Sequence, residues 1–473
     1  MWGEKCYISQ HIQLICGSVS PSAVVAQTFN LLTASPNMKA LFDQPEPLRR
    51  DISLIGVATL ALNGLIGAGI FALPAAAAQR SGMFSPWMFV LCGALMGTVV
   101  LSFAQAASYF RGTGGPVLYA QTAFGSFVGF QTGWLLYLGR VSAMAANTNA
   151  LVAYGAGLWP GMDQGAPRVV AILAVCFLLT WVNVIGVRRG MGTTNLLTAL
   201  KLLPLALFIV AGLLVIKPAG FLHASPPGPG EFAPTLLVLV YAFVGFEGAL
   251  VPAGEVRQPR RDIPRALLTT LAGTTALYVL IQAVCVGVLP GVSESTAPLA
   301  DVASRLVGPV GAGVMTLAAF LSISGNISTI MLTAPRMTYA LARDEALPAW
   351  FGNVHSDFKT PDYSIIFLGL FSFALAVSGS FVWLAVMSSL ARMLGYAVCI
   401  AALPRLRKQF ADSKDRFTLP GGLVIPGLAL VVCLWLAAQA GVRAWVVTAC
   451  FVLLGAGLFF YSRLRANSRD RRG

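Results

Sequence analysis

The 473 residues are 57% hydrophobic and only 11% charged, which excludes a soluble globular domain of this size. The chain is therefore predicted to be an all-α polytopic membrane protein. Its formal net charge of +14 does not indicate a nucleic-acid partner, because the lysines and arginines cluster in the loops on one side of the predicted membrane.

Apolar segments, each long enough to cross a hydrocarbon core of about 30 Å, recur along the whole chain. Twelve are predicted, at 52–80, 84–109, 123–155, 168–187, 194–216, 232–256, 265–290, 309–340, 363–380, 382–404, 422–440 and 443–462. Most arginines and lysines fall in the loops on one side, whereas the opposite loops contain only Arg80, Arg168, Lys217, Arg305 and Arg443. This bias predicts that both termini are cytoplasmic.

The two ends of the chain are predicted to be cytosolic tails. The first tail comprises residues 1–50, of which residues 1–45 lack the charged-then-apolar layout and the small-residue cleavage site of a signal peptide. Within them, residues 1–37 are either a dispensable tail or an upstream extension. Residues 463–473 form the second, arginine-rich tail.

The first span contains the stretch from Asn63 to Pro74, which has glycines at 64, 67 and 69 and ends in a proline. Glycine weakens a helix and proline removes a backbone donor, so a break is predicted here. In hydrocarbon, non-helical backbone is tolerated only where it is buried in protein or lines a cavity. The freed N–H groups around Gly67, Ala68 and Gly69 could then bind a carboxylate. The alternative is a face of small residues on which another helix packs closely.

The third and the fifth span each contain a cation. Arg140, in the third span, needs an anionic or carbonyl partner, because a guanidinium in hydrocarbon costs several kcal/mol. Lys201, in the fifth span, lies about two turns inside the membrane, where a lysine either extends to the headgroups or serves a buried site.

The sixth span repeats the pattern of the first. Gly245 and Gly248 are followed by Pro252, and aligning Gly245 with Gly67 places Pro252 on Pro74. Two broken helices in corresponding positions of two halves are typical of inverted-repeat transporters with a site at mid-membrane. The repeat therefore favours a cavity over a close-packing face in the first span.

Glu247 lies in the second predicted break and is the only acidic residue near the middle of a span. Either its carboxylate accepts hydrogen bonds from the freed N–H groups and holds the break in shape, or it is a proton-binding group. Polar residues follow in the eighth span, among them Asn326, and the tenth span contains Arg392 and Tyr396.

Several motifs, in this order and at this spacing, resemble the amino acid–polyamine–organocation (APC) superfamily, specifically its bacterial amino acid permeases. The resemblance covers about residues 50–408. Its motifs are Gly-Ala-Gly-Ile-Phe at 67–71, Gly-Gly-Pro at 114–116 with Tyr119 and Phe124-Gly125, Gly-Phe-Glu at 245–247 with Glu255 and Pro259, and Pro335-Arg336 with Leu347-Pro348.

The resemblance implies a leucine-transporter-like fold of twelve transmembrane helices. Residues 51–216 and 231–408 would form a 5+5 inverted repeat with discontinuous helices 1 and 6, and helices 11–12 would occupy 409–462. The substrate carboxylate would meet helix 1 amides, and its amino group would meet carbonyls of the broken helices. The matching positions are Leu65, Ile66, Gly67, Ala68 and Gly69 in helix 1, and Tyr241, Ala242, Phe243, Val244 and Gly245 in helix 6.

Charged positions receive roles from the same resemblance. Lys201 matches a lysine that replaces a sodium ion in sodium-independent members and braces helix 1 against helix 8. Glu247 remains a second coupling candidate. Arg140 and Arg392 are not general features of the superfamily, and each would either pair with Glu247 or contact substrate.

The resulting hypothesis is a secondary transporter, not an enzyme, which moves an amino acid across the plasma (bacterial inner) membrane by alternating access, without sodium. It would be a proton symporter or an exchanger, and a monomer or homodimer. No cofactor or metal is expected, because the cysteines and histidines show no metal-ligand spacing and no phosphate-binding loop is present. The alternatives are an exchanger of amines, polyamines or other carboxylated metabolites, and a membrane sensor that binds an amino acid without transporting it.

Overall fold

The computed structural model describes residues 52–110, 115–185, 191–217, 219–251, 253, 256–411, 417–419 and 421–470. The predicted tail at 1–50 and the motif residues Gly114, Pro252 and Glu255 lie outside these ranges, as do residues 471–473.

The described residues are almost all helical, and their one β contact is an isolated parallel bridge between Ile52 and Val256. The α-helices are α4 (Leu54–Leu65), α5 (Gly69–Ser81), α6 (Ser85–Ser108), α7 (Pro116–Phe124), α8 (Ser126–Ala156), α9 (Gly165–Ile185), α10 (Met191–Leu213), α11 (Ala219–Leu222), α12 (Pro229–Phe243), α13 (Pro259–Val288), α14 (Pro298–Val307), α15 (Pro309–Arg343), α16 (Asp362–Ser378), α17 (Phe381–Gln409), α18 (Val424–Ala438) and α19 (Val442–Asp470). Short 3-10 helices are η1 (Gly82–Phe84), η2 (Phe246–Leu250), η4 (Val292–Glu294) and η5 (Ala349–Gly352).

Each of the twelve apolar segments coincides with one helix or a pair of helices. Among the described residues, seven helical stretches are long and apolar enough to cross a membrane, which makes this a polytopic membrane protein. These stretches are Gly69–Ser108, Gly165–Ile185, Pro229–Leu250, Arg261–Val288, Pro309–Arg343, Phe381–Gln409 and Val442–Ala466. Shorter apolar helices occupy other predicted spans, so the number twelve stays a prediction.

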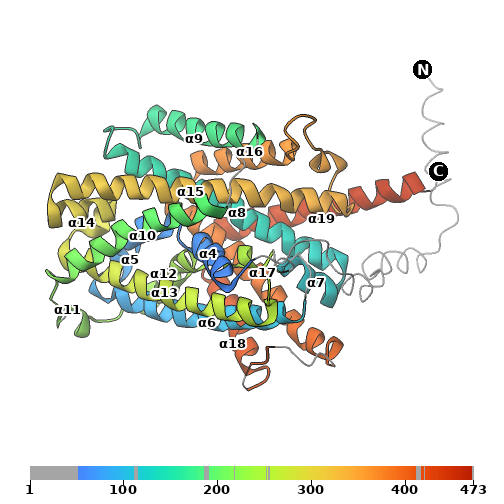
Figure 1. Ribbon diagram of the computed structural model, residues 1–473, viewed down its shortest axis with the longest axis horizontal. Helices are drawn as coiled ribbons and strands as arrows, with labels where there is room; N and C mark the ends of the chain where they lie inside the picture. Colours follow the sequence, from blue (N-terminus) through green and yellow to red (C-terminus); the bar gives the residue numbers. More distant parts are fainter. Residues whose placement is uncertain are drawn as a thin grey trace.

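The long helices run side by side, with the short helices α11 and α14 at one end of the bundle and α7 at the other (Figure 1). Within it, α17 packs on α8, α13 packs on α6, and α15 crosses α8. In the most apolar stretch of 18 residues in α12 and η2, 83% of the residues are buried. In the corresponding stretch of α9, only 17% are buried. The helices that carry the predicted site are therefore central, and α9 presents its apolar side chains outward.

The first predicted break is present. Helix α4 runs from Leu54 to Leu65 and is capped by Ser53, whose hydroxyl accepts a hydrogen bond from the N–H of Gly56. Ile66 has extended backbone angles (φ −86°, ψ 90°), and α5 starts at Gly69. Pro74 lies inside α5, downstream of the break. The interruption thus coincides with the glycines at 67 and 69.

The second predicted break is present as well. Helix α12 ends at Phe243, Val244 is extended, and Gly245 adopts φ +110°, a left-handed conformation that favours glycine. The chain continues as η2 rather than as an α-helix. Both halves of the chain therefore contain an interrupted helix, as the paired glycines predict.

Candidate functional site

The two breaks meet around a cavity of about 100 Å³. Residues from both breaks line it, together with residues of α8, α15 and α17. Among them are Gly64, Gly67, Tyr241, Gly245, Arg140 and Asn326. The cavity thus lies where non-helical backbone and intramembrane polar groups come together, as expected if the unwound segments line a site.

The last turn of α4, which leads into the first break, contacts the second break through the backbones of Gly64 and Gly245. A methyl group added to Gly64 would overlap the carbonyl oxygen of Gly245 and lie 2.9 Å from its carbonyl carbon. The converse substitution at Gly245 would place a methyl group 2.8 Å from the carbonyl carbon of Gly64. Because neither site has room for a Cβ, the pair of glycines lets the end of α4 and the second break approach each other closely.

Asparagine side chains bridge the first break. The Asn147 side-chain oxygen accepts hydrogen bonds from the Ala68 N–H (3.2 Å) and from the Tyr241 hydroxyl (2.9 Å). The amide nitrogen of Asn147 donates to the Asn326 Oδ1 (2.7 Å), and that of Asn326 donates to the Asn63 carbonyl (3.0 Å). This network connects the end of α4 to the start of α5 through α8 and α15.

Lys201 reaches the same break from α10. Its Nζ donates to the side-chain oxygen of Asn63 (2.6 Å) and to the carbonyl oxygen of Ile66 (3.4 Å), and the residue is 5% exposed. The lysine therefore does not extend to the headgroups. Its ammonium instead occupies the carbonyl end of α4, where a cation is favoured by the helix dipole.

A buried tyrosine of α13 ties the two breaks to each other. The Tyr278 hydroxyl lies 2.9 Å from the Leu65 carbonyl oxygen and 3.1 Å from the Ala242 carbonyl oxygen. Both carbonyls belong to ends of interrupted helices, where acceptors lack intrahelical partners. This contact gives α13 a part in holding the two unwound segments together.

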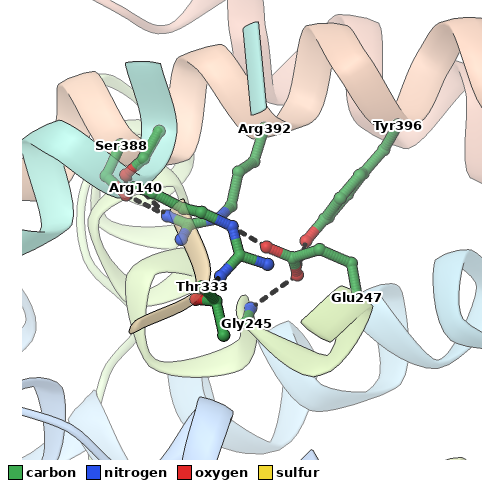
Figure 2. A network of polar contacts seen from close by, with 8 residues as sticks. Arg140, Gly245, Glu247, Thr333, Ser388, Arg392 and Tyr396 are labelled. Atoms are coloured by element: carbon green, nitrogen blue, oxygen red, sulfur yellow. Dashed lines mark hydrogen bonds and ion pairs between the residues drawn. The ribbon is translucent and has the colours of Figure 1, made fainter. Parts of the chain in front are cut away.

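Glu247 forms a buried ion pair with Arg392, the interaction that Figure 2 shows on the side of η2 that faces α17. The Arg392 Nε donates to Oε1 (3.1 Å), while the Tyr396 hydroxyl (2.5 Å) and the Gly245 N–H (2.8 Å) donate to Oε2. The carboxylate thus has a cation, a hydroxyl and a backbone amide as partners. It stabilises the break by accepting a hydrogen bond from Gly245.

Arg140 enters from α8 and lies close to this ion pair (Figure 2). Its Nη1 donates to the Thr333 hydroxyl (2.9 Å), and the side chain lines the cavity. Arg392 also donates through Nη1 to the Gly139 carbonyl (3.0 Å) and to the Ser388 hydroxyl. Of the two arginines, Arg392 is the one that pairs with Glu247.

Six of the ten positions taken from the resemblance line the cavity: Leu65, Gly67, Gly69, Tyr241, Val244 and Gly245. The other four lie around it. The Ile66 carbonyl accepts from Lys201, the Ala242 carbonyl lies within hydrogen-bond distance of the Tyr278 hydroxyl, the Ala68 N–H is bound to Asn147, and the Phe243 ring packs on Tyr278. The Gly67 N–H also has an internal acceptor, the Leu65 carbonyl (3.1 Å). Two of the three amides expected to be free are therefore occupied.

Several of the contacting groups have no role predicted from the sequence. Asn147 follows Arg140 by seven residues and Asn326 precedes Thr333 by seven, a spacing of two helical turns that places each pair on one helix face. That periodicity was available as a signal. Tyr278 offered none, because a tyrosine in an apolar helix has no feature that marks it as a bridge.

Two unwound helices crossing at a polar cavity in a polytopic membrane protein define the architecture of a membrane transport protein. Comparison with known sequences gives the family. Residues 52–469 match the family model described as amino acid permease, and the chain belongs to this family. It is accordingly an amino acid transporter and not an enzyme.

Individual relatives extend over nearly the whole chain. The branched-chain amino acid permease BcaP of Bacillus subtilis (strain 168) is 28% identical over 448 residues, which cover 88% of this chain and 94% of the relative. The serine/threonine exchanger SteT of the same organism is 26% identical, with 88% and 96% covered. A methylthioribose transporter, also from that organism, is 25% identical, with 88% and 94% covered.

Proposed function

We propose that this protein is a secondary transporter which carries an amino acid across the plasma membrane by alternating access, without sodium. The observation that carries the proposal is the crossing of two interrupted helices at a cavity, with an ammonium group already placed at the carbonyl end of the first. In this proposal the 5+5 inverted repeat comprises residues 51–216 and 231–408, helices 11–12 lie in 409–462, and both termini are cytoplasmic.

The substrate binds between the breaks. Its carboxylate approaches the start of α5 at Gly67–Gly69, where a helix N-terminus carries partial positive charge. Its amino group approaches carbonyl groups of the α12 end, in the stretch Tyr241–Gly245. Because Ala68 is bound to Asn147 in this structure, the arriving carboxylate replaces the Asn147 oxygen as acceptor.

Lys201 takes the place of a sodium ion. Its ammonium contacts Asn63 and the Ile66 carbonyl, an arrangement in which a bound sodium would compete for the same oxygens. A buried lysine that is held only by neutral oxygens can also release its proton when its surroundings change. This chemistry supports proton-coupled symport or exchange through Lys201.

Of the two roles considered for Glu247, its contacts support the structural one. The carboxylate is 1% exposed and bonded to Arg392, Tyr396 and Gly245, so it holds η2 in place instead of presenting a free oxygen to the cavity. We therefore assign coupling to Lys201.

A panel of labelled amino acids tests the proposal with the protein reconstituted in proteoliposomes, with and without a pH gradient and with sodium or choline as the cation. We expect accumulation or counterflow of at least one amino acid in both salts. Ligand binding with neither accumulation nor exchange would instead identify a sensor. Because one relative is a methylthioribose transporter, the panel also includes that compound, amines and polyamines.

A further inference from the structure

The cavity has an excess of positive charge. Two guanidinium groups line it, those of Arg140 and Arg392, and none of the described lining residues is acidic. Glu247 is not among these lining residues, and its carboxylate forms an ion pair with Arg392. Before any substrate is bound, the two guanidinium groups are therefore balanced by a single carboxylate, that of Glu247.

Arg392 uses three of its five N–H donors in bonds to the protein. Its Nε is bonded to Glu247, and its Nη1 is bonded to the Gly139 carbonyl and the Ser388 hydroxyl. A bidentate contact with a further anion would require one of these bonds to break. Arg392 is thus committed to holding α8, η2 and α17 together.

Arg140 differs from Arg392 in this respect. Its single hydrogen bond in the described part of the chain runs from Nη1 to Thr333, and its Nε is buried without a partner. The residue is only 7% exposed, although a guanidinium has five N–H donors. A buried cation with unused donors is costly, and an anion that accepts from it removes much of that cost.

Polar pairs bracket the cavity along α8 and α15. One pair is Asn147 with Asn326, at the start of α5, and the other is Arg140 with Thr333. Members of the two pairs are seven residues apart on each helix, which corresponds to about 10.5 Å of helix rise. The cavity thus has backbone amides and an amide side chain at one end, and a guanidinium at the other.

We propose that Arg140 binds the side-chain carboxylate of an acidic amino acid, so that the preferred substrate carries a net negative charge. The proposal rests on the function proposed above, in which the α-carboxylate lies at the start of α5. The second carboxylate then lies toward Arg140 and accepts from its unused N–H groups. A planar fork of donors suits a carboxylate, whereas an uncharged amide offers it only one oxygen.

The test compares each acid with its amide, because glutamate and glutamine, or aspartate and asparagine, differ in charge but hardly in size. The purified full-length protein is titrated with all four L-amino acids by thermal shift, and uptake of labelled glutamate is measured in proteoliposomes with the other three as competitors. We expect the acids to bind at least tenfold more tightly than their amides. Equal or tighter binding of the amides would overturn the proposal.

Variants then assign the preference to the residue. Arg140→Gln should reduce the acid-to-amide ratio to near one, and Arg140→Lys, which keeps the charge without the fork, should keep part of it. Arg305→Gln removes the same charge from an exposed position on α14 and should leave the ratio unchanged. A wild-type ratio retained in Arg140→Gln would refute the assignment, and if that variant does not fold, the wild-type comparison of acid with amide still decides.

The two proposals fail separately. Transport of neutral amino acids with no response to the acids would end the charge assignment and leave the transporter in place. Absence of transport of any amino acid would contradict the proposed function itself.

Discussion

Gly64→Ala is the substitution that probes the crossing of the two breaks most directly. The added methyl group would overlap the Gly245 carbonyl oxygen and lie 2.9 Å from its carbonyl carbon. Ordinary carbon contacts are about 3.5 Å or longer, so the two backbones must separate by at least about 0.6 Å, and by more to clear the carbonyl oxygen. Backbone cannot rotate away as a side-chain terminus can, and the change therefore moves one unwound segment relative to the other.

The expected cost follows from two opposing effects. Overpacking of this kind typically costs about 1–3 kcal/mol, and contact with backbone places Gly64→Ala at the upper end. Alanine is preferred over glycine inside a helix by up to about 1 kcal/mol, which offsets part of the loss. The net destabilisation should be about 2 kcal/mol, and uptake should fall strongly because the cavity lining is displaced.

Gly273→Ala provides the matched control. Gly273 lies inside α13 and has no neighbouring atom within 4 Å of an added Cβ, so it gains the helix preference without the clash. Both variants are compared with wild type by thermal unfolding in detergent and by uptake in proteoliposomes. If Gly64→Ala matched Gly273→Ala in melting temperature and in uptake, the breaks would not cross at this glycine and the geometry of the site would be wrong.

Three further outcomes are expected. Lys201→Ala should abolish uptake in proteoliposomes, because the Lys201 ammonium contacts the first break. Lys217→Ala, which removes a lysine from an exposed position, should leave uptake intact. Replacing sodium by choline should leave the initial uptake rate unchanged, and strict sodium dependence would contradict the role given to the lysine. Glu247→Gln should lower stability by about 3–5 kcal/mol in denaturation measurements, since it leaves Arg392 buried and unpaired. In the Glu247→Gln background, Arg392→Gln should lower the stability much less than it does in the wild-type protein. Strictly additive losses of stability would argue against the ion pair.

Glycine and proline spacing predicted the two interruptions, because their physical cause is local. Gly67, Gly69 and Gly245 lie at the points where helix stops, and Gly245 takes a φ of +110° that other residues rarely adopt. Apolar length likewise located each long helix, although α13 begins six residues before its predicted span and α19 ends eight residues after its own. Both kinds of signal depend on a few neighbouring residues and not on the rest of the fold.

The partners of the buried charges were not predictable in the same way. Glu247 and Arg392 are 145 residues apart, and whether they meet depends on how α17 is rotated against η2. Hydrophobic periodicity fixes such rotation poorly in helices that are buried on most sides. For the same reason, the sequence could indicate that Arg140 needs a partner but could not identify Thr333.

The backbone groups released by the first break explain why its shape depends on several helices at once. A peptide group left unpaired in a membrane costs several kcal/mol, so each needs a partner from elsewhere. Within the described part of the chain, cross-helix partners include Asn326 for the Asn63 carbonyl, Tyr278 for Leu65, Lys201 for Ile66 and Asn147 for the Ala68 amide. They come from α15, α13, α10 and α8, which are four different helices of the bundle. Any ligand that replaces one of these partners at the start of α5 therefore changes a bond between the break and a surrounding helix. Through that bond, a ligand in a small cavity can change the arrangement of the long helices.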